Sequence, residues 1–432
     1  MKTLLIIGYV WPEPKSSAAG GRMLELIQLF ATDLWHIVFA SAAAQSEHRA
    51  DLSCLGVMEQ PIMLNDSSFN DFIAGLKPDA VLFDRFFTEE QFAWRVGQAC
   101  PNALRILDTE DLHSLRHVRQ QLLKQAQQQT AHETDRQSAN PVLASRSELY
   151  ELMTVNDMAQ REIAAIYRCD ITLIISQYEV SLLTGYFSIP KTLLHYCPLL
   201  SIKAPEPSAL PGFADRQHFI SIGNFRHEPN WDAVLYLKHA IWPLIRAQSP
   251  QAELHIYGAY PPPKATHLHQ PGQGFCVKGW ADDALQVMQN ARVCLAPLRF
   301  GAGIKGKLID AMRSGTPNVT TGIGAEAMHG GLPWSGLIEH NACAFADAAV
   351  QLYSHEASWR QSQQHGFNIL SQYFAQEDYA KLLIMRVLQL RENLAQERRQ
   401  NFVGALLRHH FHKSTRYMSL WIEAKNANKP DS

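Results

Sequence analysis

The sequence predicts an α/β fold with two domains, each containing a parallel β-sheet covered by helices on both faces. Three observations support this prediction. The chain has 432 residues, which is too many for one ordinary hydrophobic core. Short apolar runs alternate with longer amphipathic stretches in both halves, as is typical of parallel sheets. A proline-rich stretch at 203–212 separates the halves and indicates an interdomain linker.

The short apolar runs place the strands of the first half at 4–7, 36–40, 80–83, 104–107 and 171–175. A polar, glutamine-rich stretch at about 114–153 is predicted to form an inserted helical hairpin, because Asn140-Pro141 interrupts it. In the second half, strands are predicted at 219–222, 254–257, 275–277, 293–296 and 318–321, with helices at 231–246, 283–290 and 304–313. Two such units would line a cleft with the carboxyl ends of their strands.

The predicted domain bounds are 1–202, 203–374 and a helical extension, 375–432. Leu383, Val387, Leu390 and Leu394 follow one helical face, so the extension is expected to pack back on the first domain. Beyond Glu397, basic residues and histidines alternate with apolar ones. Two interpretations stay open for this tail: a surface-seeking helix for anionic lipid, or a solvated helix packed on the first domain.

The composition narrows the classes of protein to which this chain can belong. The formal net charge of −2 gives no overall attraction to nucleic acid. The seven cysteines include no CxxC pair and the histidines show no ligand spacing, so no metal site is predicted and a reducing compartment fits best. The first apolar run ends at Gly8, too early for a signal peptide, and no run reaches the roughly eighteen apolar residues of a membrane span. The protein is expected to be cytoplasmic, with a peripheral position at the inner face of the membrane left open.

The most informative segment, 297–319, runs from a predicted strand through a glycine-rich loop into a predicted helix. In the loop Gly301-Ala302-Gly303-Ile304, glycines allow close approach of the backbone, and amides at a helix start attract phosphate oxygens. Lys305 and Lys307 add cationic donors, which suits a diphosphate. Asp310, one helical turn after Lys307, can accept hydrogen bonds from a ribose or sugar hydroxyl.

The run Asp310-Ala311-Met312-Arg313-Ser314-Gly315-Thr316-Pro317-Asn318-Val319 resembles the donor-site motif of the retaining GT-B glycosyltransferases, group 1 or family 4, relatives of sucrose synthase and of bacterial polysaccharide and lipopolysaccharide enzymes. The resemblance implies the GT-B fold, two Rossmann-like domains facing across a cleft. It implies that residues 301–304 bind the donor, that Asp310 holds its ribose, and that Lys305, Lys307 and Arg299 stabilise the leaving diphosphate. One departure is that the first acid of the family motif falls on Ala302.

Three further segments agree with the resemblance. Gly223 and Asn224 follow a predicted strand, where the family turns toward the donor phosphates. Val277-Lys278-Gly279-Trp280 resembles the segment that lies beside the nucleobase. Gly322-Ile323-Gly324-Ala325-Glu326 resembles a later loop, which implies that Glu326 contacts the sugar or the nucleotide.

The first half matches the family more loosely. Gly20-Gly21-Arg22 resembles the end of the family's glycine loop, so Gly21 is expected to face the donor phosphates. Asp108, Glu110, Asp111 and His113 follow a predicted strand end at the cleft wall, where they can bind acceptor hydroxyls. His113 can position the acceptor or the transferred sugar. Alternatively, these residues cap the inserted helix, with Asp111 at its start.

The resemblance therefore implies transfer of a sugar from a nucleotide-diphosphate sugar to a glycan, lipid-linked or protein acceptor, with retention of configuration. No cofactor or metal is required, because lysines and a helix dipole can neutralise the leaving diphosphate. A nicotinamide-dependent dehydrogenase is one alternative, but neither half has GxGxxG after its first strand. A second alternative is a non-catalytic GT-B subunit that scaffolds another glycosyltransferase, which is compatible with Ala302 and with the long basic tail.

Overall fold

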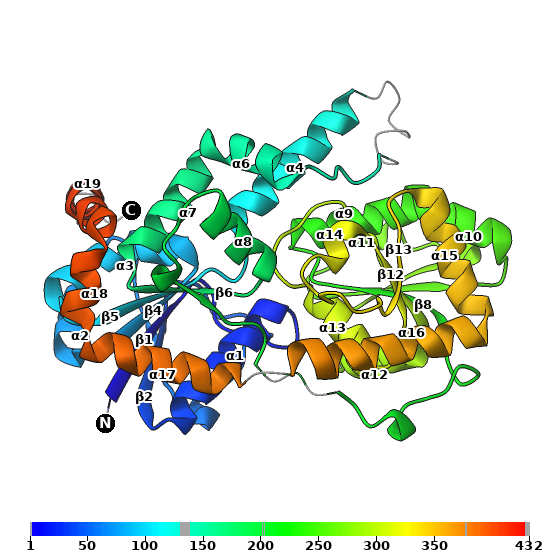
Figure 1. Cartoon of the computed structure of the whole chain (residues 1–432), viewed down its shortest axis with the longest axis horizontal. Helices are drawn as coiled ribbons and strands as arrows, with labels where there is room; N and C mark the ends of the chain where they lie inside the picture. Colours follow the sequence, from blue (N-terminus) through cyan, green and yellow to red (C-terminus); the bar gives the residue numbers. More distant parts are fainter. Residues whose placement is uncertain (1, 130–138, 201, 203, 376–377, 428–432) are drawn as a thin grey trace.

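The computed structural model describes residues 2–129, 139–200, 202, 204–375 and 378–427, and it has two α/β domains side by side (Figure 1). The first sheet has the order β3-β2-β1-β4-β5-β6-β7 and the second has the order β10-β9-β8-β11-β12-β13. Neighbouring strands in both sheets run parallel. The predicted fold class is confirmed.

In the first domain the strands are β1 (Lys2–Gly8), β2 (Trp35–Ser41), β3 (Met58–Pro61), β4 (Ala80–Asp84), β5 (Leu104–Asp108), β6 (Ile171–Ile174) and β7 (Leu194–Tyr196). Its helices are α1 (Ala18–Thr32), α2 (Ser68–Leu76), α3 (Arg85–Ala99), α4 (His113–Gln128), α6 (Arg146–Thr154), α7 (Asp157–Arg168) and α8 (Gln177–Gly185), with short 3₁₀ turns η1 (Ser53–Leu55) and η2 (Lys191–Leu193). Alternate residues of β1 enter two different cores, Leu5 and Ile7 on one face and Leu4 and Ile6 on the other. Burial on both faces explains why this strand is a continuous apolar run.

In the second domain the strands are β8 (Gln217–Ile222), β9 (Leu254–Tyr257), β10 (Phe275–Gly279), β11 (Ala291–Ala296), β12 (Asn318–Thr320) and β13 (Gly336–Ile338). Its helices are α9 (Glu228–Tyr236), α10 (Trp242–Gln248), α11 (Pro263–Thr266), α12 (Ala284–Asn290), α13 (Gly306–Arg313), α14 (Gly322–Ala325), α15 (Ala342–Ser354) and α16 (Glu356–Ile369). The short turns η3 (Pro207–Ala209) and η5 (Pro271–Gln273) and the π-helical turns η4 (Leu237–Ile241) and η6 (Leu370–Phe374) complete it. The helix predicted at 231–246 is thus α9, η4 and α10 in succession.

The strands β3, β7 and β13 were not predicted from the sequence. Each lies at an edge of its sheet, has only three or four residues, and is at most half-buried. A short, half-buried edge strand has no continuous apolar run, so hydrophobic patterning does not reveal it.

The predicted insertion corresponds to α4 and α6, which rise from the first domain toward the second (Figure 1). Residues 130–138 of the predicted hairpin lie outside the described residues. Helix α6 begins with a capping box, in which Ser145 and Glu148 each accept a backbone amide of the other. The preceding chain reaches the second domain, where the carbonyl of Ala139 accepts a hydrogen bond from Arg299 at 3.0 Å.

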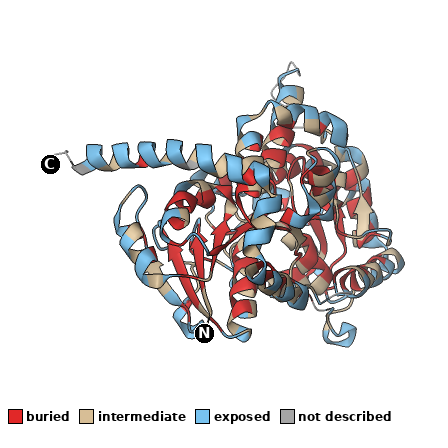
Figure 2. Cartoon of the chain, turned by 60° about the vertical axis from the view of Figure 1, so that its left-hand side comes forward, coloured by how far each residue is buried: buried red, intermediate tan, exposed pale blue. Residues whose placement is uncertain are grey.

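After α16 the chain returns to the first domain as α17 (Tyr379–Glu392), α18 (Leu394–Gln400) and α19 (Phe402–Ala427) (Figure 1). Leu383, Val387 and Leu390 of α17 join the core around β1. Helix α19 packs on α3 and α7, where Arg95 donates a hydrogen bond to Ser419 at 3.1 Å. Its other side is exposed along most of the helix (Figure 2). In the part of the chain that the structure describes, every helix is too short or too polar to cross a bilayer.

Candidate active site between the two domains

The glycine-rich loop before α13 lies directly against the first domain. Gly303 has a φ of 64°, and a Cβ built there would lie 2.8 Å from the Cβ of Asp111. Only glycine combines that left-handed conformation with such a close approach. The Gly303 amide donates a hydrogen bond of 2.8 Å to the Glu179 carboxyl of the first domain. The predicted donor loop is therefore part of the domain interface.

Two lysines follow this loop, Lys305 buried and Lys307 half-buried. The Lys305 Nζ donates to the carbonyl of Gly303 at 2.9 Å, and the Lys307 Nζ donates to the side-chain oxygen of Asn230 at 2.7 Å. Burial lowers the pKa of Lys305 to about 8, and it lowers the pKa of Lys307 to about 8 as well. Both lysines donate to neutral oxygens, so an arriving anion would find desolvated cations beside loop amides.

Gly223 holds the turn after β8 close to Lys307. A Cβ built at Gly223 would lie 2.8 Å from the Lys307 Nζ. A small pocket of about 40 Å³ opens beside this turn, and its lining includes Lys15 from the first domain together with Gly223, Asn224 and Trp280 from the second. The predicted phosphate and nucleobase segments of the donor domain thus meet at one pocket.

The domains are closed over that pocket. The Tyr260 hydroxyl donates to Glu13 at 2.8 Å, and the His48 ring stacks on Trp280 with centroids 3.9 Å apart and planes 2° apart. Glu13 and His48 belong to the first domain, and both aromatic partners belong to the second. These two contacts hold the first and second domains together beside the pocket.

The other predicted donor contacts, Asp310, Glu326 and Arg299, each lie beside a different charged side chain. Asp310 lies on α13, 3.5 Å from Arg313, and burial raises the pKa of Asp310 to about 6. Glu326 forms an ion pair of 2.6 Å with Arg119 of the first domain. Arg299 is held by Asp232, with contacts of 2.6 and 2.9 Å. The Arg299 guanidinium therefore holds α9 against the segment that follows β11, whereas Asp310 and Glu326 both come after the glycine loop in the chain.

The local structure at Gly21 and the neighbours of Ala302 differ from what the sequence led us to expect. Gly20 and Gly21 lie in the first turn of α1, so the predicted glycine loop is in fact a helix start, capped by Ser17. A Cβ at Gly21 would meet no heavy atom within 4 Å. Ala302 packs against the core of the first domain. The position at which the resembling family has an acid is thus occupied by an apolar contact across the interface.

On the first-domain side, His113 begins α4 and Asp111 lies next to it. The His113 Nε2 is 3.6 Å from the Asp111 carboxylate, and the ring meets Phe87 edge-on at 5.3 Å. Burial lowers the pKa of His113 to about 3, so the imidazole is neutral at pH 7. Burial alone would raise the pKa of Asp111, but the nearby Arg116 and His113 hold this pKa well below its usual range. A neutral His113 can orient a sugar hydroxyl, but it does not supply a proton at neutral pH.

Asp108 and Glu110 are more deeply buried in the first domain than Asp111 and His113. Asp108 is fully buried and forms an ion pair of 3.0 Å with Arg22, which also donates to the carbonyl of Cys197 at 2.6 Å. Burial and the nearby Asp108 raise the pKa of Glu110 well above its usual value. Glu110 has a φ of 61°, in the left-handed region that non-glycine residues rarely adopt. The structure places Asp108 in a buried ion pair with Arg22, with none of its side chain exposed.

Two glutamates outside the predicted set of site residues position the site. Glu162 of α7 accepts hydrogen bonds from the amides of His113 and Ser114, at 2.9 and 3.1 Å. It therefore caps α4, and the alternative that Asp111 caps this helix is wrong. Glu179 of α8 accepts from Leu112 as well as from Gly303, at 3.1 and 2.8 Å. Glu179 follows soon after the end of the strand at 174. Asp108 and its neighbours were selected because they follow the end of a strand, and the same criterion would also have selected Glu179.

A larger cavity of about 330 Å³ lies between the insertion and the second domain, and Arg119, Glu326, Tyr178 and Arg146 are among its lining residues. The two guanidinium groups pack on the Tyr178 ring, with distances of 5.1 Å for Arg119 and 4.5 Å for Arg146. Arg119 also donates to the carbonyl of Gly301 at 2.8 Å. Arg119 thus contacts both this cavity and the glycine loop.

The two facing parallel sheets and the helix-start loop between them define a two-domain GT-B protein. Comparisons with known proteins add to this geometry. Residues 216–355 match the family model of the group 1 glycosyl transferases. The matched residues span β8 to α15 of the second domain. No curated protein matches the sequence.

Solved structures with similar folds cover nearly the whole chain. Sucrose-phosphate synthase from Thermosynechococcus elongatus is 17% identical, with a TM-score of 0.59 over 90% of this chain and 99% of the other. HepE from Anabaena, in complex with UDP and glucose, is 11% identical, with a TM-score of 0.60 over 92% and 100%. A glycosyltransferase from Rickettsia africae is 10% identical, with a TM-score of 0.60 over 91% and 99%. At these identities the likeness concerns the fold.

Proposed function

We propose that this chain is a retaining glycosyltransferase that moves a sugar from a nucleotide-diphosphate sugar to a glycan or lipid-linked acceptor, without a metal ion. The observation that carries the proposal is the pair of desolvated ammonium groups, Lys305 and Lys307, on either side of the first α13 amide. Retention follows from the resemblance of residues 310–319 to the retaining family. The structure of HepE with UDP and glucose supports a nucleotide-sugar donor.

In this proposal, departure of the nucleoside diphosphate leaves positive charge on the sugar and adds negative charge to the phosphate. The loop amides and the two lysines are fixed where that negative charge would grow, and such preorganised groups are usually the largest catalytic contribution. Burial raises the pKa of Glu179 to about 8, so this carboxyl is mostly neutral at pH 7 and does not repel the diphosphate. Closure of Tyr260 on Glu13 would exclude water and limit hydrolysis.

The larger cavity is the proposed acceptor site. It shares Glu326 and Arg119 with the surroundings of the glycine loop, and it is open to solvent beside the exposed Arg146. An acceptor hydroxyl there would approach the loop from the side of α4, whose first residue is His113. Neutral His113 would then orient the hydroxyl or the transferred sugar by hydrogen bonding.

The test is a panel of UDP-, GDP- and CMP-sugars offered to the full chain in excess EDTA. We expect binding of one nucleoside diphosphate below millimolar concentration, together with slow release of sugar in the donor's own anomeric configuration, followed by NMR. Release of the opposite anomer would contradict retention, and a strict need for Mg²⁺ would contradict the metal-free mechanism. Absence of nucleotide binding at millimolar concentration would favour the scaffold alternative, which the apolar setting of Ala302 keeps open.

The affinity for the nucleoside diphosphate should depend on pH. Above the pKa of about 8, each lysine must take up a proton before it can pair with phosphate. The affinity for UDP, or for whichever nucleotide binds, should therefore fall above pH 8 by up to about tenfold per pH unit for each lysine. In Lys307→Arg, the affinity should fall less steeply with pH, by up to about tenfold per pH unit in place of the fall expected for two lysines, because arginine stays charged and takes up no proton. Titrations from pH 7 to pH 10 measure both slopes, and equal affinities across that range would contradict the phosphate role of the lysines.

Peripheral membrane contact through α19 is the second part of the proposal. Tyr417 and Trp421 are 68% and 60% exposed on the side of α19 that faces away from the first domain. Lys413, Arg416 and Lys425 are exposed on the same helix. Aromatic side chains flanked by cations suit the interface of an anionic bilayer.

Vesicle co-sedimentation tests this contact. The full chain should bind vesicles rich in phosphatidylglycerol and should dissociate from them in high salt. Lys413→Ala with Arg416→Ala should weaken the binding about thirtyfold, at about 1 kcal/mol per cation. The exposed Lys191 of the first domain supplies the matched control, Lys191→Ala. Equal binding to uncharged vesicles, or no effect of the double substitution, would remove the lipid role from α19.

A further inference from the structure

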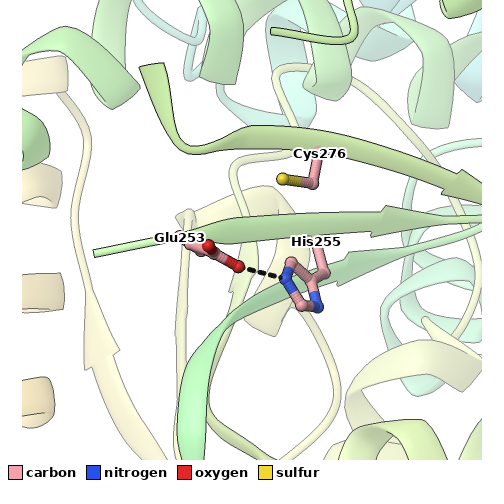
Figure 3. Close-up of side chains that lie close together, drawn as sticks. All are labelled: Glu253, His255 and Cys276. Atoms are coloured by element: carbon pink, nitrogen blue, oxygen red, sulfur yellow. Dashed lines mark hydrogen bonds and ion pairs between the residues drawn. The ribbon is translucent and has the colours of Figure 1, made fainter. Parts of the chain in front are cut away.

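Three side chains of metal-binding type gather on one face of the second sheet, at the end away from the interdomain cleft. Glu253, His255 and Cys276 each offer one ligand atom, and these atoms all lie within 4.8 Å of one another. Figure 3 shows the three side chains converging from neighbouring strands. We propose that they bind one zinc-class divalent ion, in a structural site separate from the sugar-transfer chemistry.

The sheet itself fixes this arrangement. His255 of β9 and Cys276 of β10 are register partners on adjacent parallel strands, so their side chains lie on the same face. Glu253 precedes His255 by two residues and therefore points to that face as well. The carboxyl ends of the same strands lead to the other side, where Gly258 lines the nucleotide pocket. Because two ligands come from paired strands, ligand positions exist before any ion arrives.

The ligand set is one that zinc prefers. Thiolate, imidazole and carboxylate together suit a tetrahedral ion with water in the fourth position. The His255 Nε2 lies 2.8 Å from the Glu253 carboxylate, whereas its Nδ1 is buried, so Nε2 is the nitrogen that can reach an ion.

Two neighbours shape the site without binding the ion. The His218 ring stacks on His255 with centroids 3.9 Å apart and planes 22° apart. Imidazole lone pairs lie in the ring plane, so nearly parallel rings cannot direct them to one point. Lys278, two residues beyond Cys276 on β10, brings a positive charge near the site. That charge opposes a cation, so Lys278 should weaken the site.

Binding should release one proton. The thiolate, not the thiol, is the form of cysteine that binds a metal ion, and an ordinary thiol is protonated at neutral pH. The ion replaces that proton, while Glu253 and neutral His255 bind as they are. Thiolate and carboxylate together cancel the charge of a divalent ion, which a half-buried site favours. The ion would fasten the edge strand β10 to β9 and stabilise the second domain by mass action.

Cobalt substitution tests the site directly. The full chain, reduced and freed of metal with chelator, is titrated with Co²⁺. We expect one equivalent to produce a thiolate-to-cobalt absorption band and the visible bands of four-coordinate Co²⁺, both abolished by Zn²⁺. Calorimetry of Zn²⁺ binding in buffers of different ionisation enthalpy should give one proton released per ion.

Variants separate this site from adventitious binding. Cys276→Ser should abolish the thiolate band, and the exposed Cys343→Ser should leave it unchanged. Glu253→Gln, an exposed position that should not disturb folding, is expected to weaken binding by at least the about 10–100-fold that loss of an outer-shell partner costs. Lys278→Ala should tighten binding.

The proposal is overturned if millimolar Co²⁺ gives no thiolate band, or if the band survives Cys276→Ser. It is also overturned if Glu253→Gln and His255→Ala bind Co²⁺ as the parent chain does. None of these results depends on the sugar-transfer activity, which Glu253→Gln should leave unchanged.

Discussion

Lys307→Ala is expected to lower kcat/KM for the nucleotide-sugar donor by about 10²–10³, equivalent to about 2.7–4 kcal/mol of transition-state stabilisation. The Lys307 ammonium is held by a neutral amide oxygen at 2.7 Å, beside the turn at Gly223. Removing it deletes a charge that would act mainly when negative charge grows on the leaving diphosphate. Initial rates with the active donor, at several concentrations, give the change in kcat/KM.

The matched control is Lys238→Ala, because Lys238 lies on the same domain but pairs with Gln270 at 2.7 Å. Its rates should stay within about twofold of the parent chain. Stability separates loss of catalysis from loss of fold: burial of the Lys307 charge is unfavourable, so the alanine variant should unfold no earlier than the parent. A Lys307→Ala variant that is folded and fully active would refute the proposed phosphate site.

Asp108→Ala is expected to lower the free energy of unfolding of the first domain by about 3–5 kcal/mol. The substitution leaves the buried guanidinium of Arg22, only 1% exposed, without its carboxylate at 3.0 Å. Urea unfolding, followed by far-UV circular dichroism, measures the change. Asp108→Ala with Arg22→Met should be less destabilised than the single variant, because the unpaired charge is gone.

An exposed ion pair provides the comparison for Asp108. Arg360 and Glu356 lie 2.6 Å apart with side chains 61% and 52% exposed, so Glu356→Ala should cost no more than about 1 kcal/mol. If Asp108→Ala instead kept the stability of the parent chain and lost only its affinity for acceptor, the sequence-based assignment of Asp108 to the acceptor side would be right and the structural role wrong.

Local patterns allowed much of the fold to be predicted. Runs such as 4–7 and 80–83 mark central strands because both faces of these strands are buried. The edge strands β3, β7 and β13 lack that burial and left no such pattern. The loop at 301–304 with Lys305 and Lys307 was visible for a similar reason: its glycines, lysines and helix start are consecutive, so their chemistry is encoded locally.

The sequence by itself determined the parallel α/β domains, the order of their central strands along the chain, and a donor loop that suits a diphosphate. Only the tertiary structure decided which side chains share a site. Glu179 meets Gly303, 124 positions away, and Asp108 pairs with Arg22 across 86 positions. His255 and Cys276 come together because β9 and β10 are neighbours in the sheet. Such contacts depend on how strands pair and domains close, and nothing in the residues next to each partner specifies that geometry.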